Sequence, residues 1–144
     1  MFILYNIFIN IFCLFSKTYL KIRIKNKKEH PERYLEKLSI TNLPANKNRI
    51  IWFHAASVGE LLSIFPLIDK LLRENLFEKI LVTSITLSSS QIFDQKYKNN
   101  EKIIHQFLPI DKSKFIKNFL DHWKPNALVL IESEIWPNLI YETK

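Results

Sequence analysis

The stretch IIWFHAASVGE, residues 50–60, joins two different sequence patterns. Ile50–His54 is a short, mostly apolar run rich in β-branched and aromatic residues, which is typical of a buried strand. Beyond it, apolar side chains recur at the three-and-four spacing of a helix with one buried face. They are Val58, Leu61, Leu62, Phe65, Ile68, Leu71 and Leu72. A buried strand that leads into such a helix is the first half of a βαβ unit, so this stretch predicts an α/β fold.

The same alternation continues to residue 131. Further strands are predicted at Lys79–Ser84, Ile103–Leu108 and Ala127–Ile131. A polar loop, Ile85–Ser90, and a weaker helix around Gln91–Lys98 separate the first two of these. Asp111 is predicted to cap a further helix, which carries an apolar side and ends before Pro125. Four strands joined by three helical crossovers predict a parallel, right-handed, Rossmann-like sheet with ligands at the carboxyl ends of its strands.

Residues 1–24 are predicted to be a membrane-anchor helix with a basic flank. Residues 2–15 are apolar apart from two asparagines, and residues 16–37 carry eight Lys and Arg side chains against three Glu, a net +5 of the chain's +7. Cationic charge directly behind an apolar segment favours anionic lipid over nucleic acid as the partner and places the protein body in the cytoplasm. A core helix, an interfacial helix and a spanning helix all remain open, because a 14-residue segment is short for ~30 Å of hydrocarbon.

Residues 25–49, polar and punctuated by Pro31 and Pro44, are predicted to be a linker, and residues 50–144 the Rossmann-like domain. A composition of 47% hydrophobic and 24% charged residues is that of a globular protein. The single cysteine excludes an internal disulfide, and the four histidines lack the spacing of a metal site. Neither a metal nor a cofactor is predicted.

Glu60 has two readings at the junction of the first strand and helix. Ser57-Val58-Gly59-Glu60 matches the capping box, in which Ser57 accepts from the Glu60 amide and the carboxylate reaches back to the Ser57 amide. The same position is the carboxyl end of a strand, where open α/β sheets bind ligands, and Gly59 allows close approach to the backbone. A carboxylate there is also suited to general-base catalysis.

A second acidic pair, Glu132 and Glu134, follows the fourth strand directly, on the same predicted edge of the sheet as Glu60. Solvated turn residues and a shared cleft are both compatible with this spacing. Thr83 and Ser84 end the second strand on that edge, as turn residues or as ligands of a sugar or phosphate. The glycine-rich and lysine loops of the usual nucleotide sites are missing from this sequence.

Three motifs resemble the N-terminal domain of the bacterial 3-deoxy-D-manno-octulosonic acid (Kdo) transferases. They are IWFHAASVGE at 51–60, LPID at 108–111 and IESEIWPNLI at 131–140. The resemblance implies the acceptor-side half of a GT-B glycosyltransferase that moves Kdo from CMP-Kdo to a lipid A precursor in lipopolysaccharide biosynthesis. The resemblance also implies that the enzyme acts at the cytoplasmic face of the inner membrane and needs no metal. By this resemblance Glu60 is the general base, with Glu132, or second Glu134, near the transition state.

Ser57, Gly59, Thr83, Ser84 and Asn138 are the expected substrate-binding residues. The family's donor-binding C-terminal domain does not occur in these 144 residues, so the chain is expected to be inactive unless a separate C-terminal polypeptide supplies that half. The alternative is a non-catalytic, membrane-anchored lipid-binding module or a degenerate gene fragment. Nucleic acid is not expected as a partner.

Overall fold

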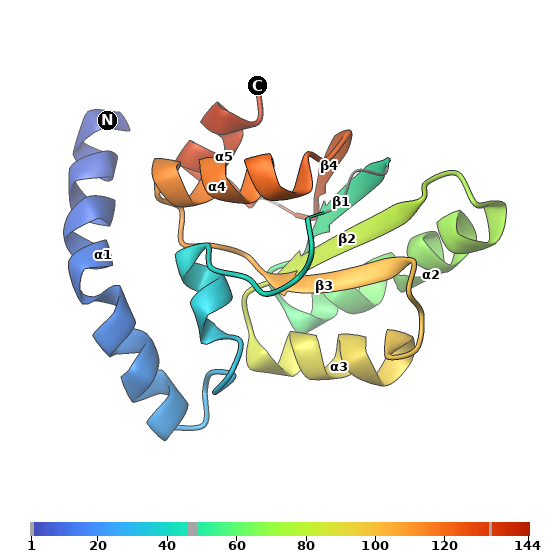
Figure 1. Cartoon of the computed structure of the whole chain (residues 1–144), viewed down its shortest axis with the longest axis horizontal. Helices are drawn as coiled ribbons and strands as arrows, with labels where there is room; N and C mark the ends of the chain where they lie inside the picture. The colour runs from blue at the N-terminus through green and yellow to red at the C-terminus, as the bar shows by residue number, and fades with distance from the viewer. Residues whose placement is uncertain (1, 46–48, 133) are drawn as a thin grey trace. The chain divides into compact units, whose positions relative to one another are not determined.

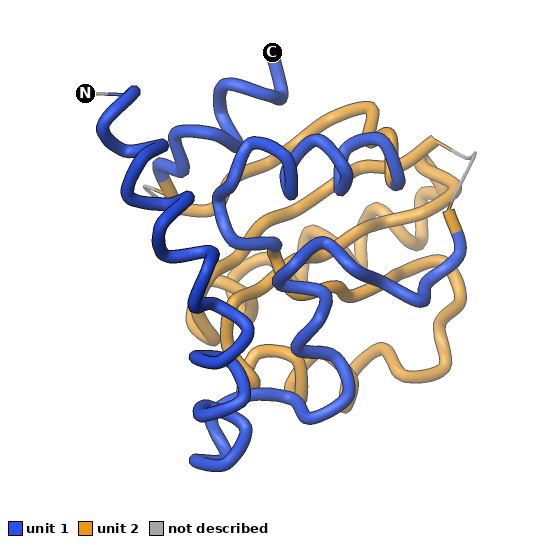
Figure 2. The backbone as a smooth tube through the Cα atoms, turned by 60° about the vertical axis from the view of Figure 1, so that its left-hand side comes forward, with its two compact units in different colours: residues 1–44, 109–122, 135–144 blue, residues 45–108, 123–134 orange. Residues whose placement is uncertain are grey.

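The computed structural model describes residues 2–45, 49–132 and 134–144, which form two compact units (Figure 2). The helical unit consists of Met1–Pro44, Pro109–His122 and Ile135–Lys144. The sheet unit consists of Ala45–Leu108 and Trp123–Glu134. Each unit is therefore assembled from segments that are distant in sequence.

The sheet unit contains a four-stranded parallel sheet in the order β3-β2-β1-β4 (Figure 1). The strands are β1 (Ile50–His54), β2 (Lys79–Ser84), β3 (Ile103–Phe107) and β4 (Ala127–Leu130). The predicted parallel α/β sheet is confirmed, and β3 and β4 end one residue earlier than the sequence suggested. His54, at the end of β1, pairs in register with Thr83 of β2 on one side and with Leu130 of β4 on the other.

Two helices, α2 (Val58–Glu74) and α3 (Leu87–Tyr97), share one apolar core with the sheet. Alternate strand positions point toward this core, because successive side chains of a strand face opposite sides. The core contains Ile51, Phe53, Ile80 and Val82 from the strands, Leu61, Ile64, Phe65 and Ile68 from α2, and Phe93 and Tyr97 from α3. This packing fixes the start of α2 directly behind β1.

The helix α3 begins inside the segment that was predicted to be a polar loop. Thr86 takes the N-cap position, and its hydroxyl accepts from the Ser89 amide. The helix therefore starts at Leu87 rather than near Gln91, so the loop prediction for 85–90 is wrong for most of its length. Serines that suggested a loop occupy the first helical turn because a capped helix end tolerates them.

The helical unit contains α1 (Phe2–Lys25), the short 3-10 helix η1 (Tyr34–Leu38), α4 (Ser113–Trp123) and α5 (Pro137–Glu142). The last residue of α4, Trp123, is assigned to the sheet unit. A buried ion pair joins α1 to η1: the Glu29 carboxylate lies 2.7 Å from Lys37 Nζ and 3.2 Å from Arg23 Nε. Burial lowers the pKa of the Lys37 ammonium, and the Glu29 charge opposes that shift.

Five residues other than glycine have left-handed backbone conformations among the described positions. They are Lys27, Ser39, Asn75, Lys124 and Glu132, with φ between 47° and 63°. Ser39 and Asn75 end η1 and α2 in this way. A Cβ atom disfavours this conformation sterically, so each ordinary residue in it lowers the stability of the fold by ~1 kcal/mol or more.

Asp111 was predicted to cap α4, and this prediction is wrong. Its carboxylate instead accepts from the backbone amides of Asn138 (2.9 Å) and Leu139 (2.8 Å) in the first turn of α5. It also accepts from the Tyr5 hydroxyl of α1 at 2.6 Å. One buried carboxylate thus caps α5 from a distant part of the chain and ties α1 to it.

Asp111→Ala is expected to lower the free energy of unfolding by about 2–3 kcal/mol, because three donors lose a charged acceptor at once. Tyr5→Phe, which removes one of the three bonds, is the matched control and should cost about 1 kcal/mol. Urea unfolding followed by far-UV circular dichroism measures both. Equal losses for the two variants would contradict this account of Asp111.

Candidate functional site

The candidate site lies at the carboxyl edge of the sheet unit, where β1 passes into α2. His54 ends β1, and Ser57 is the N-cap of α2 with an extended backbone (φ −110°, ψ 167°). Ligands of open α/β sheets bind at this edge. The capping geometry therefore determines which polar groups are presented there.

The Glu60 carboxylate is held by two donors from the preceding turn. Oε2 accepts from the Ala56 amide and Oε1 from the Ser57 hydroxyl, both at 2.8 Å. The Ser57 Oγ in turn accepts from the Glu60 amide at 3.3 Å. The predicted capping box is present, but the carboxylate reaches the amide of Ala56 rather than that of Ser57. Each carboxylate oxygen keeps further acceptor capacity, so capping does not exhaust Glu60.

Gly59 lies in the first turn of α2, beside open space. Its φ is not positive, and a Cβ added there would meet no protein atom within 4 Å. Neither backbone strain nor close packing therefore requires glycine at this position. An open surface next to Glu60 is what a ligand approaching the backbone would need.

His54 is a fully buried polar residue at the same edge, and it is not among the site residues expected from the sequence. Its Nδ1 lies 2.9 Å from Thr83 Oγ1, and its Nε2 lies 3.7 Å from the Glu134 carboxylate. Burial lowers the pKa of His54, while Glu134, the Thr83 carbonyl and Glu60 raise it. The signal in the sequence that could have identified His54 was a polar residue at the end of an otherwise apolar strand.

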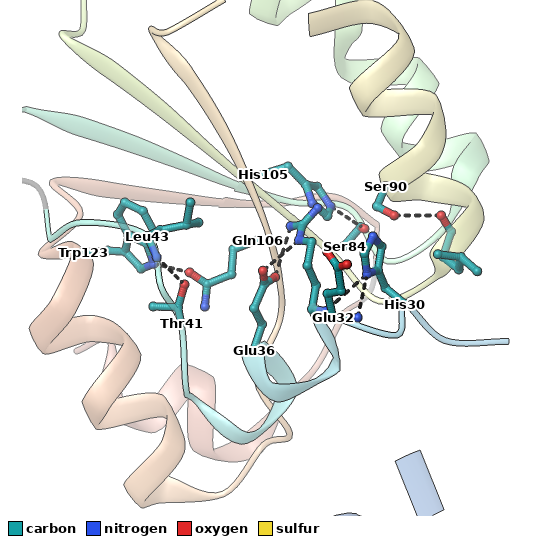
Figure 3. Close-up of polar contacts among 12 residues, drawn as sticks. His30, Glu32, Glu36, Thr41, Leu43, Ser84, Ser90, His105, Gln106 and Trp123 are labelled. Carbon is teal, nitrogen blue, oxygen red and sulfur yellow. Dashed lines mark hydrogen bonds and ion pairs between the residues drawn. The ribbon is translucent and has the colours of Figure 1, made fainter. Parts of the chain in front are cut away.

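Thr83 and Ser84, predicted to bind substrate, are fully buried and bonded within the protein. The Thr83 hydroxyl accepts from Trp52 Nε1 at 2.8 Å, in addition to its contact with His54. Ser84 Oγ lies 2.8 Å from His105 Nε2. Figure 3 shows this contact together with the hydrogen bond that Trp123 donates to Gln106. The two hydroxyls thus organise buried histidines and do not reach an open surface.

The two acids after β4 have different environments. Glu132 is exposed and has a left-handed backbone, with φ 63°. Glu134 is mostly buried, with a side chain 22% exposed, and faces His54. Of this pair, Glu134 is the one that the structure places in contact with the residues at the end of β1.

Asn138 belongs to the helical unit, where it holds the start of α5. Its amide donates to the Asp111 carboxylate, and its Nδ2 donates to the Asp111 carbonyl at 2.6 Å. The side chain is fully buried in this contact, and its role in substrate binding stays a prediction. Across residues 2–45, 49–132 and 134–144, no group of three or more His, Cys, Asp or Glu side chains is arranged to hold a metal ion.

Comparison with known proteins places the chain in one class of glycosyltransferases. Residues 29–144 match the family model described as 3-deoxy-D-manno-octulosonic-acid transferase (kdotransferase). The chain belongs to this Kdo transferase family, as its N-terminal part. The family resemblance seen in the sequence is thereby confirmed, and the four-stranded parallel sheet is consistent with one half of a GT-B enzyme.

Individual relatives carry the same description. A 3-deoxy-D-manno-octulosonic acid transferase of Rickettsia bellii is 41% identical over 122 residues, which are 84% of this chain and 28% of that protein. A probable mitochondrial transferase of Arabidopsis thaliana is 36% identical over 112 residues, 78% of this chain and 25% of that protein. The chain therefore spans about a quarter of the length of these relatives.

Stability should fall as the pH drops below about 6.5, the ordinary histidine pKa. Because the pKa of folded His54 is lowered, the unfolded chain binds a proton at higher pH than the folded one, and the native state is penalised on acidification. Urea unfolding at several pH values, followed by tryptophan fluorescence, measures this slope. His54→Gln should flatten it, and an unchanged slope would show that other groups produce it.

Proposed function

We propose that this chain is the acceptor-side part of an enzyme that transfers Kdo from CMP-Kdo to a lipid A precursor in lipopolysaccharide core biosynthesis. Membership of the Kdo transferase family supports the chemistry. The observation that carries the assignment is the Glu60 carboxylate, fixed by Ala56 and Ser57 beside the open surface at Gly59.

Glu60 acts in this proposal as the general base. The acceptor hydroxyl gives its proton to the carboxylate, and its oxygen forms a bond to the anomeric carbon of Kdo while the bond from that carbon to the CMP phosphate breaks. The donors from Ala56 and Ser57 fix the carboxylate without consuming all of its acceptor sites. General-base catalysis of this kind typically contributes 10²- to 10⁴-fold.

Glu134 is the second acid that we assign to the site, in preference to Glu132. Its carboxylate contacts His54 at the end of β1, and His54 is also within electrostatic reach of Glu60. We assign donor binding to the part of the enzyme that these 144 residues do not include, as the matched segments make up only 25% and 28% of the two relatives. Without that part the chain would not align donor with acceptor, so we expect no transfer by the chain alone.

Attachment of α1 to the cytoplasmic face of the inner membrane is the remaining part of the proposal. The helix is 24 residues long and apolar enough to cross a membrane by length and composition. Within the helical unit, however, contacts near both ends tie it down, from Tyr5 to Asp111 and from Arg23 to Glu29. A helix held near both ends and apolar elsewhere is suited to lying in the interface. Its exposed apolar side chains include Ile3, Leu4, Phe8, Ile11, Leu14 and Phe15.

Transfer is best tested in a chimaera in which residues 29–144 replace the matching segment of the Rickettsia bellii protein. The chimaera is expected to transfer Kdo to a lipid A precursor, and Glu60→Gln should reduce kcat by 10²- to 10⁴-fold. Glutamine still suits a capping box, so the fold should survive. Full activity of Glu60→Gln would refute the general base, and acceptor binding without transfer would favour the lipid-binding module.

Gly59→Ala is the matched variant for the same assay. If Gly59 had only a structural role, alanine would raise helix stability by roughly 0.5–1 kcal/mol and leave transfer unchanged. The proposal expects the added methyl group to obstruct the acceptor, so KM for the acceptor rises although the protein is at least as stable. Thermal unfolding and acceptor titration separate the two results.

Membrane attachment is tested by replacing both Phe8 and Phe15, which are 65% and 66% exposed, with glutamate. Binding to vesicles of phosphatidylethanolamine and phosphatidylglycerol should fall at least about tenfold, because two aromatic side chains no longer enter the lipid. Leu76→Glu, at a 53% exposed position in the sheet unit, is the control and should bind normally. Co-sedimentation measures both, and equal binding by all three proteins would exclude α1 as the anchor.

A further inference from the structure

His54 has an arrangement that core packing alone does not explain. Its side chain is fully buried, yet Nε2 has no hydrogen-bond partner among the described residues. A buried polar atom is normally hydrogen-bonded, because leaving it unpaired costs free energy. The group that Nε2 faces is the Glu134 carboxylate, at 3.7 Å, which is longer than a hydrogen bond and within the range of a charge interaction.

The partners of Thr83 determine which ring nitrogen of His54 carries the proton. The indole Nε1 of Trp52 can only donate, so at 2.8 Å it occupies one acceptor site of the Thr83 hydroxyl. The hydroxyl proton then has two acceptors within reach, His54 Nδ1 at 2.9 Å and the Phe53 carbonyl at 3.5 Å. Nδ1 also lies 3.2 Å from the Thr83 carbonyl, which would accept from an Nδ1–H. The shorter contact with the hydroxyl and the negative carboxylate in front of Nε2 together favour Nδ1 as the acceptor, which places the ring proton on Nε2, toward Glu134.

We propose that His54 is a positioning residue for Glu134: Thr83 orients the imidazole so that Nε2–H faces the Glu134 carboxylate and holds it at the carboxyl edge of the sheet. The inference rests on the proposed function only for the role given to Glu134. Glu134 itself lies outside the helices and strands, whereas His54 is fixed in β1. A rigid strand thereby positions an acid that lies outside the regular elements.

The charges around His54 agree with this arrangement. The titratable groups that act on it are Glu134, from the segment after β4, and Glu60, from α2. Because burial lowers the pKa of His54, the ring is neutral near pH 7 and acts as a donor rather than as a cation. The neutral ring therefore presents a donor, and not a second charge, to the Glu134 carboxylate.

The test uses the full chain in detergent micelles, with ¹⁵N-labelled histidine and long-range ¹⁵N–¹H spectra that report the tautomer and titration of each ring. The other three histidines serve as internal references for an intact fold. His54 is expected as the Nε2–H tautomer. Glu134→Gln should shift its titration to lower pH, whereas Glu132→Gln, the same change two residues away, should not.

Thr83→Val gives an independent readout, because it removes the hydroxyl and keeps the shape. The His54 proton should then move to Nδ1 and be donated to the backbone carbonyl of residue 83, which lies 3.2 Å from Nδ1 in the unaltered chain. An Nδ1–H tautomer in the unaltered chain, or equal titrations in Glu134→Gln and Glu132→Gln, would overturn the proposal. None of these measurements requires Kdo transfer, so they stand apart from the chimaera assay.

Discussion

The parallel pairing of β1 with β2 and β4 is the constraint on which the site depends. Because the register aligns His54 with Thr83 on one side and Leu130 on the other, three strands end within one residue of the same level. Glu60 and Glu134 are 74 residues apart in sequence, yet each follows one of these strand ends within a few residues. A one-residue slip in either ladder would turn alternate side chains to the other face and separate His54 from its partners.

Much of the fold follows from local sequence patterns. Strand positions were predictable because parallel strands buried on both faces need continuous apolar runs such as Ile50–Phe53. The start of α2 was predictable because Ser57 and Glu60 cap it through their own neighbours in sequence. The start of α3 was missed because hydroxyl residues suit loops and helix N-termini equally, and only the backbone at Thr86 distinguishes them.

Contacts between distant segments could not be predicted in the same way. Asp111 stands two residues before α4 in sequence, which suggested a local cap, but its carboxylate serves amides 27 and 28 residues further on. Likewise, nothing in the residue types of Thr83 and Ser84 distinguishes a substrate ligand from a partner of a buried histidine. Burial decides between these roles, and burial depends on which segments the folded chain brings over the strand ends.

The scarcity of glycine has a consequence for how far the chain can be altered. A protein of 144 residues with one glycine must turn sharply elsewhere with bulkier residues, as Lys27, Ser39 and Lys124 do. These three positions lie away from Glu60 and the residues that hold it, so relieving the left-handed backbone there would raise the stability of the fold without altering the candidate site. These turns are therefore the first positions to change when a more stable protein is needed for crystallisation.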